Sequence, residues 1–208
     1  MIDQQTLITY LAILLGFVFI PGPAVLLTLA RATSSGTRVG IATALGIAAG
    51  DLVHTAMAVI GISAIVMTSA LMFTLVKYIG AAYLVYLGIR AFREKFDGSA
   101  VQPSIRMTSN EAFRQAILAE VLNPKSAMFF LAFLPQFVKP ENGMVSVQLI
   151  VLGVLFVMMG LISTIVVAMS AGSVSRYLHK SPTIVRWQGK VVGSIYCGLG
   201  LRLALQER

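Results

Sequence analysis

Three ionisable side chains, those of Asp51, Glu120 and Lys125, lie inside long apolar stretches of the sequence, and His54 follows Asp51 by one helical turn. A helix would place Asp51 and His54 on one face. A carboxylate near the centre of a bilayer costs about 2.5–3.5 kcal/mol on insertion scales, so by default it marks a transport pathway or a coupling site. We therefore predict that Asp51, His54 and Glu120 couple to protons. A purely structural hydrogen-bonded arrangement, Asp51 with His54 or with broken backbone, stays open as the alternative.

The chemistry expected of Asp51 is a competition between a proton and a cation. Burial favours the neutral form of an acid, whereas a nearby cation or a ligand's ammonium group favours the charged form. Such a site would let an incoming proton displace an outgoing ammonium group, and His54 could relay or stabilise that proton.

Two of the apolar stretches are interrupted by proline, at Pro21-Gly22-Pro23 and at Asn123-Pro124-Lys125. Proline ends a helix but fits the first position of the next one, and asparagine is a good N-cap, so each interruption predicts a helix that stops and restarts. Within hydrocarbon such a break is tolerated only where it faces protein or a watered cavity. Paired breaks in corresponding places of two halves indicate a transporter binding site.

The two breaks and Asp51 should lie at a similar depth. Gly22, Asp51 and Asn123 are about nine or ten residues from the expected helix ends, or roughly 14 Å, close to the middle of a core about 30 Å thick. Restarted helices offer backbone N–H groups to a carboxylate, Lys125 adds a positive charge, and Asp51 supplies the opposite sign, so a small zwitterion would match. Lys125 could instead extend to an interface or pair with Glu120. The predicted substrate-binding residues are Pro21, Gly22, Pro23, Ala24, Asp51, Asn123, Pro124 and Lys125.

These residues must be positioned by membrane helices. Of the 208 residues, 57% are hydrophobic and only 12% are charged, against roughly 25% charged in an average soluble domain. Six apolar stretches reach the roughly 20 residues that cross a bilayer: residues 5–31, 39–67, 71–92, 112–138, 145–172 and 184–205. We predict an all-α integral membrane protein of six spans, the first and fourth broken. The fifth span has no acid to match Asp51, and its middle and end carry the polar residues Ser163, Thr164 and Ser170.

A polar segment divides the spans into two groups of three. Residues 94–110 include Gly98 and Pro103 and indicate a cytoplasmic linker within one transmembrane domain, 1–208. The halves are then 1–93 and 111–208. Because each half holds an odd number of spans, any structural repeat between them is inverted.

The net charge of +8 is explained by orientation and does not require a nucleic-acid partner. Eleven basic residues flank the connections after spans 1, 3 and 5, whereas four lie toward the opposite side, which places the former in the cytoplasm and both termini outside. The eleven are Arg31, Arg38, Arg90, Arg93, Lys95, Arg106, Arg114, Arg176, Lys180, Arg186 and Lys190, and the four are Lys77, Lys139, Arg202 and Arg208.

Several other classes of protein fit the sequence poorly. The single cysteine, Cys197, excludes an internal disulfide and a cysteine-based metal cluster. A nucleophile and base at motif spacing are absent from the sequence, so we expect no enzyme, and we expect no cofactor and no resident metal. Two alternatives to an exporter remain: a divalent metal-ion exporter using Asp51, His54 and Glu120, and a membrane scaffold that transports nothing. Whether small residues such as Gly46 and Gly50 pack within the chain or against a second copy is left open.

The order and spacing of these motifs resemble the amino-acid efflux family of the lysine exporter and the threonine and homoserine exporters. The resemblance runs nearly end to end and is carried by four segments: Pro21-Gly22-Pro23-Ala24, residues 46–51, residues 77–88, and Asn123-Pro124-Lys125 followed by residues 133–137. It implies six spans, secondary active export of amino acids coupled to the proton-motive force, and a bacterial inner membrane.

The chain departs from the family pattern in span 4. Ala116 stands where the family usually has glycine, and Glu120 stands where it often has a polar amide. With Asp51, Glu120 and Lys125 as its only deep charges, the interior favours a small neutral amino acid such as leucine, threonine or homoserine over lysine or arginine.

Overall fold

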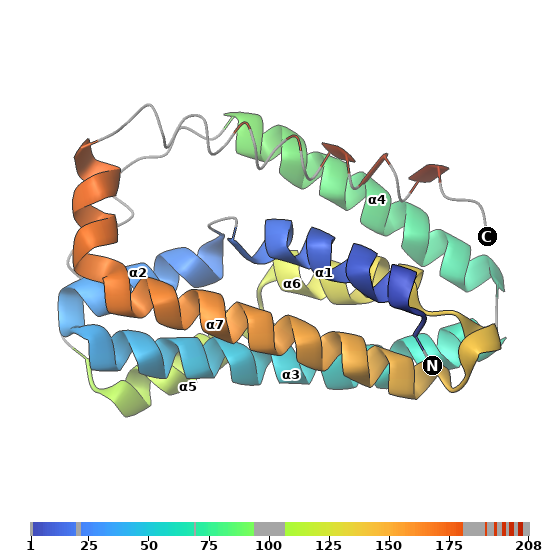
Figure 1. The fold of residues 1–208 in the computed structure, drawn as a ribbon, viewed down its shortest axis with the longest axis horizontal. Coiled ribbons are helices and arrows are strands. Elements are labelled where there is room, and N and C mark those ends of the chain that lie inside the picture. The colour runs from blue at the N-terminus through green and yellow to red at the C-terminus, as the bar shows by residue number, and fades with distance from the viewer. Residues whose placement is uncertain are drawn as a thin grey trace.

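The computed structural model describes residues 2–19, 22–68, 70–93 and 107–180, together with scattered positions between 190 and 205. In these parts the chain is built from helices and their connections (Figure 1). In chain order, they are α1 (Gln4–Phe19), α2 (Pro23–Ser35), α3 (Thr37–Thr68), α4 (Ala70–Arg93), α5 (Ser109–Val121), α6 (Pro124–Met128), a π-helical turn (Phe129–Phe133), two 3₁₀ turns (Leu134–Phe137 and Pro140–Asn142) and α7 (Val145–Lys180).

Four of the predicted spans correspond to two long single helices and to two pairs of helices that are bent at a break. Residues Thr37–Gly61 of α3 and Val145–Ser173 of α7 are long and apolar enough to cross a membrane unaided. Two bent pairs pass the same test together: α1 with α2, bent by 48°, and α5 with the segment Pro124–Phe137, bent by 45°. Helix α4 coincides with the third predicted span, whereas the sixth, residues 184–205, and most of the linker 94–110 lie outside the described residues.

Local sequence explains both bends. Gly22 is the N-cap of α2 in an extended conformation, with Pro23 at the first helical position. Asn123 is the N-cap of α6, where its side-chain oxygen accepts a hydrogen bond from the Lys125 amide at 3.0 Å and Pro124 follows at the first helical position. Both predicted helix restarts are therefore confirmed.

The helices surround an aromatic core. Tyr10, Phe17, Phe129, Phe130 and Phe156 are almost completely buried and belong to one cluster. The Tyr10 hydroxyl donates to the Leu152 carbonyl at 2.8 Å, so its polar end is satisfied within the core. The phenylalanines that follow the second break thus pack inside the protein.

Glycines let α3 approach its neighbours closely. A Cβ atom on Gly46 would lie 2.3 Å from the Phe113 carbonyl oxygen, and one on Gly50 would lie 2.6 Å from Glu120 Cβ, both on α5. On α7, a Cβ on Gly153 would lie 2.4 Å from Thr55 Cγ2. The small residues of α3 therefore serve packing within the chain, and Figure 1 shows α3 and α7 side by side over much of their length.

Two contacts identify the ends of the bundle. Lys139 Nζ contacts Asp3 Oδ2 at 2.9 Å, which places the chain's start beside the connection before α7. Arg31 donates to the Gln115 side chain at 3.0 Å, which joins the end of α2 to α5. Each contact thus joins two segments that lie at the same end of the bundle.

The outer surface is apolar where a soluble protein would be polar. Large hydrophobic side chains on α7 are exposed at intervals of one to four residues, forming a surface that suits lipid: Val147, Ile150, Val151, Val154, Met158, Ile162, Val166 and Met169. Several charged and polar side chains, among them Asp51, His54 and Glu120, are by contrast buried.

Candidate functional site

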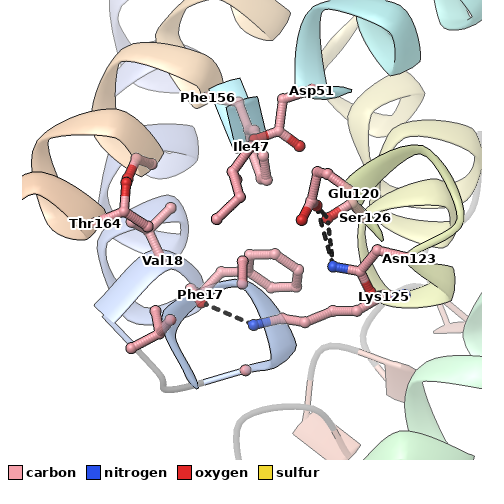
Figure 2. Close-up of a pocket in the computed structure, with 14 residues that line it drawn as sticks. Phe17, Val18, Ile47, Asp51, Glu120, Asn123, Lys125, Ser126, Phe156 and Thr164 are labelled. Carbon is pink, nitrogen blue, oxygen red and sulfur yellow. Dashed lines mark hydrogen bonds between the residues drawn. The ribbon is translucent and has the colours of Figure 1, made fainter. Parts of the chain in front are cut away.

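A cavity of about 50 Å³ lies where the two helix breaks meet (Figure 2). At about 10–15 Å³ per water-sized position, this is room for a few water molecules or a small polar group. Its walls come from all the broken elements and from α3 and α7: Phe17, Val18, Gly22, Ala24, Val25, Ile47, Asp51, Glu120, Asn123, Lys125, Ser126, Phe156, Gly160 and Thr164.

Two buried carboxyl groups share this cavity. Asp51 on α3 and Glu120 on α5 are each 3% exposed, and Figure 2 shows their side chains pointing into the same space. Within the described part of the chain, Asp51 Oδ1 is buried without a hydrogen-bond partner. Gly160 of α7 lies across from it, since a Cβ there would be 3.8 Å from Asp51 Oδ2. The cavity therefore contains a carboxyl oxygen that is able to accept from a ligand.

The Glu120 carboxyl is held by the second break. Asn123 Nδ2 donates to Glu120 Oε1 at 3.0 Å, and the Ser126 hydroxyl donates to the same oxygen. Asn123 thus has two functions, because its side-chain oxygen also caps α6. The hydrogen bonds of Asn123 therefore connect the Glu120 carboxyl to the start of α6.

In the sequence of each break, a proline, which has no backbone N–H, stands four residues after a residue of the preceding helix. Pro21 follows Phe17 at this spacing, and Pro124 follows Glu120. Lys125 Nζ donates to the Phe17 carbonyl at 3.4 Å, and His54 Nε2 lies 2.9 Å from the Glu120 carbonyl. In both cases, a side chain from another element contacts the carbonyl.

Lys125 reaches from the second break to the first. Its Nζ lies 4.3 Å from the centre of the Phe17 ring. A Cβ atom on Gly22 would lie 2.9 Å from Nζ and 3.2 Å from Lys125 Cδ, so only glycine leaves this path open. The ammonium group is consequently placed beside the N-terminus of α2.

The structure gathers most of the predicted site residues. Gly22, Ala24, Asp51, Asn123 and Lys125 line the cavity, as does the predicted coupling residue Glu120. Pro23 and Pro124 are exposed and do not line the cavity, and each begins the helix that follows its break. His54 is buried but is not part of the cavity wall. Pro21 lies outside the described residues.

Sequence reasoning missed other wall residues, notably Phe17, Ser126, Phe156 and Gly160. Ser126 could have been found, since it directly follows the predicted second break. Thr164 was visible as a polar residue in an apolar span, but its placement on the cavity wall depends on how α7 is rotated. No local sequence signal gives that rotation for Phe156 or Gly160.

An all-helical chain with an apolar outer surface and a charged cavity between two helix breaks has the architecture of a membrane transporter. Consistent with this class, the chain belongs to the LysE type translocator family, whose family model matches residues 15–207. This is a family of transporters.

The chain is also similar to several bacterial membrane proteins. An uncharacterized membrane protein of Vibrio cholerae is 35% identical over 202 residues, which cover 97% of this chain and 98% of its own length. The uncharacterized membrane protein YrhP of Bacillus subtilis is 28% identical over 211 residues, covering 97% of this chain and all of its own. No solved structure matches the chain.

Proposed function

We propose that this protein is a secondary active exporter of small neutral amino acids, of the leucine, threonine or homoserine type, driven by proton antiport. The observation that carries the proposal is the cavity, which combines an oxygen of Asp51 that has no hydrogen-bond partner among the described residues with the ammonium group of Lys125 beside the N-terminus of α2. Opposite charges at two ends of one small space suit a zwitterion.

The carboxylate of the substrate binds at the first break. Gly22 gives α2 no side-chain cap, so backbone N–H groups and the positive end of the helix dipole are available to an anion. Gly22, Ala24 and Val25 all line the cavity. Lys125 supplies a full positive charge at this end.

The ammonium group of the substrate binds at Asp51. Oδ1 of Asp51 is an acceptor without a partner in the described residues, and leaving a buried acceptor unsatisfied is costly. The apolar wall formed by Val18, Ile47 and Phe156 then receives the substrate side chain. This lining supports a small neutral side chain over a cationic one.

Coupling follows from the pair of acids. Two carboxyl groups sharing a buried space do not both hold a negative charge readily, so a proton and a substrate ammonium compete for the pair. An incoming proton would displace the outgoing substrate from Asp51, with Glu120 as the second acid. This exclusion is what antiport requires.

We also propose the complete architecture: six spans in two inverted halves, in a bacterial inner membrane, with both termini outside. Similar bends of 48° and 45° in the two broken pairs support the repeat, and the charge distribution supports the orientation.

The proposal is tested with purified protein in liposomes. Efflux of labelled leucine, threonine, homoserine, lysine and divalent metal ions would be measured with and without a pH gradient. We expect efflux of a neutral amino acid to be faster when the proton gradient is directed inward, so that protons enter as the amino acid leaves. Movement of a divalent metal ion alone would support the metal-exporter alternative, and no movement of any of these compounds would contradict the proposal.

A further inference from the structure

The Glu120 carbonyl oxygen is at the centre of the second break. Pro124 removes the helical donor that would normally reach it. Two other donors fill the place: the Asn123 amide at 2.9 Å and His54 Nε2 at 2.9 Å. A carbonyl oxygen can only accept, so the imidazole nitrogen that faces it carries the hydrogen.

The rest of the His54 ring is fixed by packing. Its side chain is 2% exposed and stacks on Phe130, with ring centroids 5.7 Å apart and planes 18° apart. Phe130 belongs to the π-helical turn after the break. His54 therefore joins α3 to the elements on both sides of the second break.

The backbone that His54 holds carries one of the two cavity acids. The side chain of that residue, Glu120, shares the cavity with Asp51, and its Oε1 is fixed by Asn123 and Ser126. A shift of the Glu120 backbone would move its carboxyl relative to Asp51. At the first break, a side chain from another element likewise reaches a backbone carbonyl, since Lys125 donates to the Phe17 carbonyl.

We propose that His54 is a positioning residue whose Nε2–H replaces the amide that Pro124 lacks, and that it thereby sets the Glu120 carboxyl beside Asp51. The effect of His54 on transport rests on the proposed function, whereas its hydrogen bond to the Glu120 carbonyl does not. It differs from a proton relay, because a permanent donor to a carbonyl keeps its hydrogen throughout the transport cycle.

The structural part is tested without any substrate. Thermal unfolding in detergent would be compared for wild type, His54→Leu, Pro124→Ala and the double variant. Pro124→Ala restores a backbone N–H, so we expect the fall in Tm caused by His54→Leu to shrink by at least half in that background. An equal fall in both backgrounds would overturn the proposal. Thr43→Val is the matched control, since the Thr43 hydroxyl is buried on α3 and donates only to its own helix, at Val39; its effect should be the same with or without Pro124.

The transport part is tested in liposomes with His54→Leu and His54→Gln, whose amide nitrogen can reach the position of Nε2. His54→Leu leaves the buried Glu120 carbonyl with one donor fewer, which should reduce pH-driven efflux by about tenfold. His54→Gln should recover most of that efflux, with an unaltered pH profile. Failure of His54→Gln to recover driven efflux, with substrate exchange intact, would show that His54 relays protons. Wild-type efflux by His54→Leu would also contradict the proposal. If wild type itself exports no amino acid, the proposed function fails while the unfolding experiment still decides the role of His54.

Discussion

Asp51 combines three properties that we expect of an acid that exchanges protons. It is 3% exposed, Oδ1 has no partner in the described residues, and its side chain faces a cavity rather than a helix end. His54, one turn away, has a backbone partner instead. The two residues that looked equivalent in sequence thus differ in what they contact.

Asp51→Asn should abolish pH-driven efflux while leaving substrate exchange measurable. The amide keeps the size and much of the hydrogen bonding of the acid but cannot exchange a proton. Uptake and exchange of labelled amino acid would be followed in vesicles with the amount of inserted protein measured. Near wild-type driven efflux would mean that Asp51 is structural.

Gly22→Ala should reduce transport several-fold with little effect on folding. The new Cβ would meet the flexible end of the Lys125 side chain at 2.9 Å and displace its ammonium group from the first break. Gly16→Ala is the control, because a Cβ at Gly16 has no described atom within 4 Å. Transport rates and yields of folded protein would be compared for both variants, and equal transport by the two would rule out this role for Gly22.

At the scale of elements, the breaks could be predicted because proline and asparagine act through local backbone geometry. The direction in which the Lys125 side chain points could not be predicted, because its contact with Phe17 joins residues 108 positions apart in the sequence. The same holds for the α7 residues of the cavity, whose placement depends on packing against α3. The sequence therefore predicted where helices stop, but not which side chains meet across the stops.

Gly46→Ala should destabilise the protein by about 1–3 kcal/mol, the usual cost of overpacking a tight contact. Its Cβ would lie 2.3 Å from a backbone oxygen of α5, which cannot move aside as a flexible side chain would. Gly61→Ala on the same helix has open space among the described atoms and should be neutral or stabilising. Chemical or thermal unfolding in detergent would compare the two, and equal stability would contradict the close approach of α3 and α5.

For the whole molecule, two contacts show which segments share each end of the bundle. Asp3 and Lys139 meet at one end, and Arg31 and Gln115 meet at the other. The sixth predicted span lies largely outside the described residues, so its presence stays a prediction from hydrophobicity alone.

Reporter fusions test the orientation. We expect a reporter that works only outside the cytoplasm to be active when it is fused after Arg208. A reporter that works only in the cytoplasm should be active when it is inserted in 94–106. A cytoplasmic signal from the first fusion would contradict the orientation and the even number of spans that it requires.

Acid should weaken the pairing of Asp3 with Lys139. The hydrogen bond from Lys139, together with those from Thr6, holds the pKa of the Asp3 carboxyl well below its usual range. A lowered folded-state pKa contributes stability above the unfolded value, about 3.9, which is lost as pH falls toward the folded value. Asp3→Asn should therefore flatten the dependence of Tm on pH below about 4. The exposed acid Glu141 gives a control variant, Glu141→Gln, and an unchanged acid dependence in Asp3→Asn would contradict the effect.

The glycine contacts of α3 also bear on how the cavity could open alternately to the two sides of a membrane. Helices α3, α5 and α7 touch where a single added carbon would clash, and interfaces packed this closely shift as units rather than deform. The broken segments have hinges already built in, at Gly22 and Asn123. Because Gly40 of α3 meets Ala32 of α2 just as closely, alternating access would then be a movement of α1 and α6 relative to a block formed by α2, α3, α5 and α7, and each turnover would bend the chain at the two breaks where we propose that the substrate binds.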